Sequence, residues 1–184
     1  MMIKQVKDEI LTLYTLIKEF IVLILVSVLI FMIMNYFDHK NNQIVLATFL
    51  IIFSLSKICV LMSKTLNRVE FLIRENHKTT HVLFFFLVII ISINVSFTLD
   101  YLCVSQIYSD SFAGLNLDQT TLFKFFDLLY FSIVTFTTVG YGDIFPVGKA
   151  VKVLTILEMA TSFITIAFII SRYTKHANQG LKTK

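Results

Sequence analysis

The chain has 184 residues, of which 57% are hydrophobic and only 15% are charged. Soluble domains contain roughly 45–50% apolar and about 25% charged residues, so this composition excludes an ordinary soluble enzyme and a disordered tail. The net charge of +4 is too small and too scattered for a nucleic-acid-binding protein, and two cysteines do not make a disulfide scaffold. The composition predicts a membrane protein.

Four long apolar stretches predict an all-α membrane protein with four transmembrane helices. Each stretch is close to the roughly 20 residues with which a helix crosses the hydrocarbon core of a bilayer. A helix satisfies its own backbone hydrogen bonds in lipid, whereas an isolated strand does not. The first stretch is longer than the core of a cleavable signal peptide and no small-residue cleavage site follows it, so we expect it to be retained. The stretches are 20–34, 44–62, 82–99 and 153–171.

The distribution of basic residues predicts that both termini are cytoplasmic. We expect the chain to reside in the plasma membrane. With the N-terminus inside, most basic residues lie on the cytoplasmic side. That inside group comprises Lys4, Lys7, Lys18, Lys64, Arg68, Arg74, Lys78, Arg172, Lys175, Lys182 and Lys184. The expected outside group comprises Lys40, Lys124, Lys149 and Lys152, with Asp38, Asp100, Asp110 and Asp118.

Three side chains inside the spans carry separate expectations. Lys57 is expected to extend its long side chain to the inner interface, and a contact with another helix is the alternative. Cys59 and Cys103 are expected at different depths, too far apart for a disulfide, as free and buried thiols.

A shorter apolar segment, 121–136, lies between the third and fourth spans. At 1.5 Å per residue it reaches roughly 24 Å as a helix, and Lys124 and Asp127 interrupt its start. Asp118 or Thr120 is expected to cap its N-terminus. The segment predicts a re-entrant helix, which is tolerated only where protein or a water-filled cavity surrounds it.

The seven residues 137–143, directly after this segment, read Thr-Thr-Val-Gly-Tyr-Gly-Asp. This string resembles the selectivity-filter signature of potassium channels, and Pro146, the Gly148-Lys149 pair and an apolar helix follow it as in that family. The similarity covers about residues 82–172. It implies a pore domain over 81–172, with outer helix 82–104, pore helix 121–136, filter 137–143 and inner helix 148–172.

The resemblance implies that main-chain carbonyls replace the hydration water of permeant K⁺ ions. Those carbonyls belong to Thr138, Val139, Gly140 and Tyr141, and the Thr138 hydroxyl completes the innermost site. Glycine at 140 and 142 permits the positive φ that turns successive carbonyls inward. Because one chain supplies one strand, we expect a homotetramer in membrane lipid, with no cofactor and no nucleic-acid partner.

Residues around the filter are expected to hold its diameter. Val139 and Tyr141 are expected to pack against the pore helix, and Tyr130 to bind Asp143 behind the filter. Glu158 lies within the fourth span, where an ionised group is costly unless it is paired. We favour a Glu158 carboxyl bonded to the pore helix, with cavity lining as the alternative. The expected supporting residues are Thr137, Gly142, Asp143, Tyr130 and Glu158.

The inner helix has neither Gly nor Pro from 149 to 179. By resemblance, Ser162 stands where many relatives have a hinge glycine. Since sharp helix bends need Gly, Pro or an inserted group, our hypothesis is that this helix does not hinge widely. Conduction would then be controlled at the filter or at an apolar narrowing near Ile166, Ile169 and Ile170.

The remaining segments have no counterpart in the resemblance. Residues 1–19 predict an amphipathic cytoplasmic helix or a straight continuation of the first span, 20–80 two additional spans with a cytoplasmic loop, and 173–184 a short basic tail. No span carries a ladder of arginines, so we expect no voltage sensor, and we expect no cytoplasmic ligand-sensing domain within this chain.

Three classes of function remain for such a membrane protein. The leading one is passive, potassium-selective conduction, and the alternative is a non-conducting regulatory subunit of a heteromeric channel. An enzyme or transporter is not expected, because the sequence has no metal-ligand cluster and no nucleophile–base arrangement. The histidines His39, His77, His81 and His176 lie outside the spans.

Overall fold

The computed structural model describes residues 2–36, 42–74, 79–116 and 118–182, and helices make up most of them. Two short strands accompany the helices. The elements are α1 Met2–Tyr36, α2 Gln43–Arg74, α3 Thr79–Ile107, β1 Phe112–Ala113, α4 Thr121–Phe136, β2 Phe145–Pro146 and α5 Lys149–Lys182.

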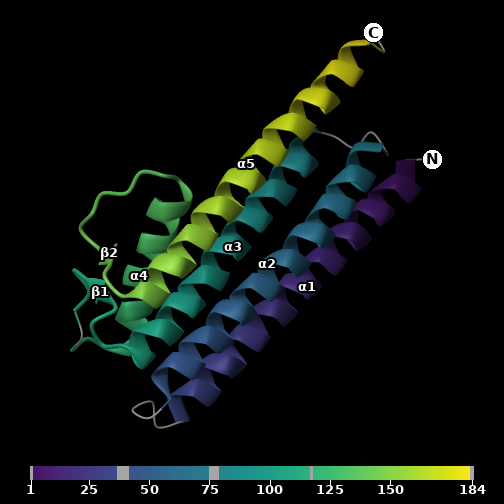
Figure 1. Ribbon diagram of the computed structural model, residues 1–184. Helices are drawn as coiled ribbons and strands as arrows, with labels where there is room; N and C mark the ends of the chain where they lie inside the picture. The colour runs from purple at the N-terminus through teal and green to yellow at the C-terminus, as the bar shows by residue number, and fades with distance from the viewer. Residues whose placement is uncertain (1, 37–41, 75–78, 117, 183–184) are drawn as a thin grey trace.

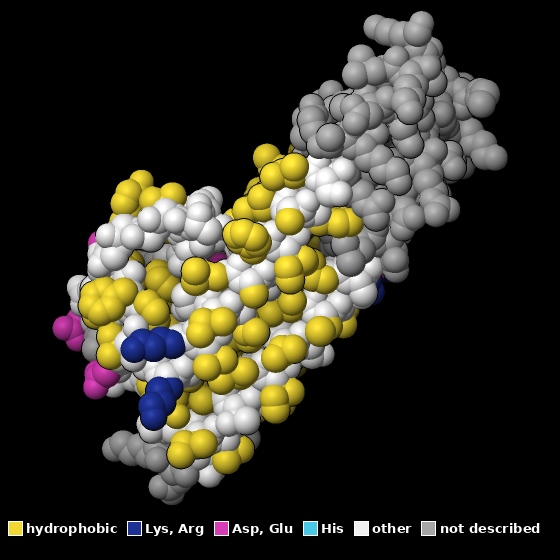
Figure 2. Space-filling model, turned by 45° about the horizontal axis from the view of Figure 1, so that its top comes forward, with side chains coloured by type: hydrophobic (Ala, Val, Ile, Leu, Met, Phe, Trp, Pro, Cys, Tyr) yellow, Lys and Arg dark blue, Asp and Glu magenta, His cyan; other side chains and the backbone are white. Residues whose placement is uncertain are grey.

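Four of the described helices are long and apolar enough to cross a membrane, which confirms the predicted all-α membrane fold. Their spanning windows are Ile17–Met34 in α1, Gln43–Lys64 in α2, Phe84–Ile107 in α3 and Lys149–Ser171 in α5. α1 is one continuous helix, which is the second of the two arrangements considered for residues 1–19. On the face shown in Figure 2, hydrophobic side chains are spread along the described part of the bundle.

The four long helices run alternately up and down, so α1 begins and α5 ends at the same end of the bundle (Figure 1). β1, α4 and β2 lie toward the opposite end (Figure 1). The strands pair antiparallel, Phe112 with Pro146 and Ala113 with Phe145, which was not predicted from the sequence. This pairing joins the loop before α4 to the loop after the filter segment.

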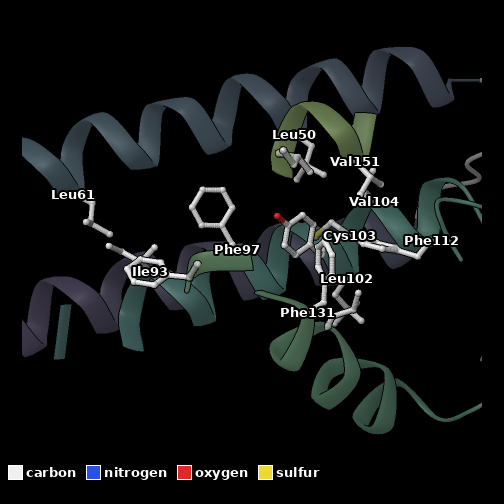
Figure 3. Packing of buried hydrophobic residues seen from close by; sticks show 14 of the residues in the cluster. Leu50, Leu61, Ile93, Phe97, Leu102, Cys103, Val104, Phe112, Phe131 and Val151 are labelled. Carbon is white, nitrogen blue, oxygen red and sulfur yellow. The ribbon is translucent and has the colours of Figure 1, made fainter. Parts of the chain in front are cut away.

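α3 is the central helix, since it contacts each of the other helices. Of its spanning window 67% is buried within the chain, against 17% for α1 and 28% for both α2 and α5. The ring of Tyr101, which belongs to α3, makes edge contacts with the rings of Phe112 and Phe131. Figure 3 shows Leu50 of α2 and Val151 of α5 close to the same cluster. The hydrophobic core therefore packs against α4.

The structure contradicts the expectation that Lys57 reaches the interface. Lys57 is 4% exposed, and its ammonium lies 2.6 Å from the Asp100 carboxylate of α3. Asp100, expected in the outside group, is likewise buried at 2% exposure. Because Asp100 on the neighbouring helix neutralises the Lys57 ammonium, the Lys57 side chain does not need to reach water at the membrane interface.

The two thiols differ in their surroundings. Cys103 is buried as expected, whereas Cys59 is exposed on α2, so the prediction of burial is wrong for Cys59. A span that contacts its neighbours on one side leaves its other side uncovered, and apolar composition alone does not tell the two sides apart. The predictions for Asp38, His39, Lys40, His77, Lys78 and Lys184 concern positions outside the described residues.

Candidate functional site

The segment 137–143 extends from the C-terminal end of α4. The N–H groups of Thr138 and Val139 donate to the carbonyls of Thr135 and Val134, both at 3.0 Å. A helix leaves its last carbonyls without partners inside the helix, and here the following segment supplies them. At the other end of α4, Thr120 takes the N-cap position without a side-chain cap bond, so neither Thr120 nor Asp118 caps as expected.

The backbone of this segment alternates in handedness. φ is +60° at Thr138, +57° at Gly140 and +80° at Gly142, while the residues between them have negative φ. An alternation of positive and negative φ lets successive carbonyl groups turn toward the same side of the segment. Thr138 is the sole non-glycine with positive φ in the described part of the chain. The sequence indicated the glycines but not Thr138, where a β-branched residue is strained by about 1–3 kcal/mol.

The side chains of the segment find little cover within one chain. The Tyr141 ring stacks on Tyr130 of α4, with centroids 6.5 Å apart and planes 2° from parallel. Even so, Tyr141 is 72% and Val139 53% exposed. Packing against α4, which was predicted for both, therefore accounts for only part of their surface. The rest of each side chain is exposed in the single chain.

Tyr130 also contacts Asp143, the residue that ends the segment. The Tyr130 hydroxyl donates to the Asp143 carboxylate at 2.8 Å. This hydrogen bond stabilises the ionised carboxylate and lowers the pKa of Asp143 below its ordinary value. Both ends of the segment are thus held by the same helix.

The loop after β1 also contacts the segment 137–143, at its last residue. Gly114, just after β1, has φ +83°, and a Cβ atom on it would come within 1.9 Å of the Asp143 carbonyl oxygen. Only glycine allows this approach. Gly114 was not predicted as a site residue, because a lone glycine in a loop gives no sign of which backbone it will face.

Glu158 joins three helices behind the segment. Its carboxyl is fully buried, accepts a hydrogen bond from the Tyr101 hydroxyl of α3 at 2.5 Å, and accepts another from the Ser132 hydroxyl of α4. Ser132 Oγ also lies 3.1 Å from the main-chain oxygen of Asn94 in α3. Full burial leaves no surface of Glu158 for lining a cavity. Tyr101 and Ser132 were not singled out from sequence, since nothing in their spacing identifies the acid they face.

The four residues named as an inner gate do not share one face of α5. Ser162 is fully buried, and its hydroxyl donates to the Glu158 carbonyl at 2.8 Å. Ile169 packs partly against the core. Ile166 and Ile170 are exposed, at 38% and 61%, on the side where Phe163 is 74% exposed. Phe163, which was not singled out from the sequence, thus lies on the same exposed face as Ile166 and Ile170.

Residues 96–178 match the family described as "Ion channel". The chain is 40% identical over 74 residues to "Two-pore potassium channel 4" of Arabidopsis thaliana, a match that covers 40% of this chain and 24% of that protein. It is 41% identical over 62 residues to "Potassium channel K2" of Plasmodium falciparum, covering 31% of this chain and 4% of that protein. The chain thus spans less than a quarter of either relative, and no solved structure matches it.

Proposed function

Because its region 96–178 belongs to the ion-channel family and is related to potassium channels, we propose that this membrane protein conducts K⁺ passively and selectively through a pore formed by four copies. In this proposal α3 is the outer helix, α4 the pore helix and α5 the inner helix of each copy. Residues 137–143 form the filter, and carbonyls of Thr138, Val139, Gly140 and Tyr141 coordinate the ions.

The alternating handedness at Thr138, Gly140 and Gly142 is the observation that carries the proposal. A K⁺ ion leaves water only where oxygen atoms replace its hydration shell, and a strand whose carbonyls face one side can supply them. The C-terminal end of α4 meets this strand, and its partial negative charge favours a cation. A family of channels is not a class of enzymes, and conduction needs no resident cofactor.

Four-fold assembly is supported by the surfaces that a single chain leaves uncovered. α4 exposes Leu122, Phe126 and Ile133, and the segment 137–143 pairs with no strand among the described residues. A closed ring of identical copies covers such faces by a heterologous contact repeated around an axis. The shared end of α1 and α5 supports the part of the proposal that places both termini on one side of the membrane (Figure 1). The basic residues near the span ends predict that this side is cytoplasmic, and we propose the plasma membrane as the location.

Flux from liposomes tests the proposal. Purified chain reconstituted in vesicles is expected to release K⁺ much faster than Na⁺, with block by barium. Gly140→Ala is the matched negative control, because Gly140 has φ +57° and no other group lies within 4 Å of the place its new methyl group would take, so only backbone conformation changes. Equal Na⁺ and K⁺ flux would remove selectivity from the proposal. Absence of any flux from a folded tetramer would favour the regulatory-subunit alternative.

A further inference from the structure

The buried ion pair between Lys57 and Asp100 connects the two leading helices to the pore region. The Lys57 ammonium lies 2.6 Å from the Asp100 carboxylate and 3.3 Å from the Ser27 hydroxyl of α1. It also lies 5.0 Å from the centre of the Phe53 ring. One side chain of α2 thus contacts α1 and α3 at once, among apolar side chains and the hydroxyl groups of Ser27 and Ser54.

Asp100 is followed directly by Tyr101, which belongs to a second polar cluster. Asp100 contacts α2, while the Tyr101 hydroxyl reaches Glu158 of α5. Glu158 in turn accepts from Ser132, which lies one turn before the end of α4. Adjacent residues of α3 therefore join α2 on one side to the pore helix on the other.

We infer that the Lys57–Asp100 pair is a positioning element for the filter, and this inference rests on the proposed function. The pair fixes the rotation and height of α3 at residue 100, which places the Tyr101 hydroxyl for Glu158. Glu158 then holds Ser132, and so holds the end of α4 from which residues 137–143 extend. The first two helices thereby become part of the framework of the ion sites.

The test removes the pair without leaving one charge unpaired. Lys57→Met combined with Asp100→Leu replaces two buried polar side chains by apolar ones of similar size, which a membrane-embedded core tolerates. The matched control is Lys64→Met combined with Glu19→Leu. That pair joins α2 to α1 instead of α3, at 3.7 Å, with side chains 51% and 32% exposed.

Two measurements on the reconstituted full chain read out the effect. Hydrogen exchange of residues 121–143 is expected to accelerate in the Lys57/Asp100 double variant and not in the control. The K⁺/Na⁺ permeability ratio from reversal potentials is expected to fall about threefold or more, within the usual coupling range for contacting residues. In a Glu158→Gln background the same double change is expected to have no further effect, because Gln keeps an acceptor oxygen for only one of Tyr101 and Ser132 and so interrupts the connection. Lys57→Arg, which keeps the ion pair, is expected to retain the parent exchange rate.

An unchanged hydrogen-exchange rate of residues 121–143 in the Lys57/Asp100 double variant would overturn the inference. So would additive changes in that rate when the double change and Glu158→Gln are combined. Exchange in Lys57→Arg as fast as in the double variant would do the same. Because exchange requires no conduction, these results stand apart from the proposed function. A parent chain without selective flux defeats that function, while the exchange data still decide whether the pair positions α4.

Discussion

At Gly114 the loop after β1 lies very close to the backbone of Asp143, the last residue of the segment 137–143. Gly114→Ala would place a methyl group 1.9 Å from the Asp143 carbonyl oxygen, and φ +83° is itself unfavourable for alanine. We expect destabilisation by more than about 1 kcal/mol and a lower thermal unfolding midpoint in detergent. Gly148→Ala is the control, since its methyl group would meet only ordinary contacts from 3.6 Å outward. Equal midpoints for the two variants would contradict the close approach.

The hydrogen bond between Tyr130 and Asp143 can be tested through the pKa of Asp143. The hydrogen bond from Tyr130 lowers the pKa of Asp143, so its stabilising contribution is present above the ordinary pKa and disappears as the pH falls through the lowered value. Tyr130→Phe is expected to return this pKa toward its ordinary value. A ¹³C-carboxyl NMR titration measures the shift, with Asp143→Asn to assign the signal. A pKa that is the same in both proteins would rule out the hydrogen bond as its cause.

Some contacts of individual residues could be predicted from the sequence and others could not. The glycines at 140 and 142 and the contact between Tyr130 and Asp143 could be expected, because they depend on local conformation or on a familiar string of residues. The donors to Glu158 could not, since Tyr101 is 57 positions and Ser132 26 positions away. The pairing of Lys57 with Asp100 was missed for the same reason: composition identifies a buried charge but not the helix that neutralises it.

Among the elements, α5 combines an uninterrupted helix with one uncovered face. Phe163 is 74% exposed, whereas its neighbour Ser162 is fully buried. In a chain whose two cysteines are replaced by alanine, Phe163→Cys is therefore expected to react with a water-soluble thiol reagent many times faster than Ser162→Cys. Similar rates at the two positions would mean that α5 is rotated about its axis from the orientation described.

The absence of glycine and proline from 149 to 179 makes a second prediction for α5. Ser162→Gly introduces a flexible point and weakens the helix by roughly 0.5–1 kcal/mol. If limited bending of α5 restrains opening, single-channel recordings of this variant are expected to show a higher open probability than the parent. An unchanged open probability would count against a gate limited by the hinge.

For the whole molecule, the uncovered faces predict a tetramer of about four times 21.2 kDa, measured by light scattering with the detergent contribution subtracted. Phe126→Ala, at 56% exposure on α4, is expected to shift protein from tetramer to smaller species. Phe49→Ala on α2, at 54% exposure, is the matched control and is expected to leave the mass unchanged. A monomeric parent chain would be incompatible with a shared ion pathway.

At this scale the four apolar helices long enough to span a membrane and the shorter helix between the third and fourth could be predicted from the sequence, because both depend on hydrophobic length. The central place of α3 could not, since its span is buried on most sides although, like the largely uncovered span of α1, it is long and apolar. Lipid and protein interior favour the same side chains, so hydropathy does not distinguish helices that face one from helices that face the other.

The Lys57–Asp100 pair also bears on how the chain enters the bilayer during synthesis. Alone, each of these side chains makes its helix roughly 3 kcal/mol less favourable to integrate. Neutralising each other removes much of that barrier, so α2 and α3 gain by leaving the translocon together rather than one at a time. We therefore expect the order in which α2 and α3 partition into the bilayer to depend on this contact.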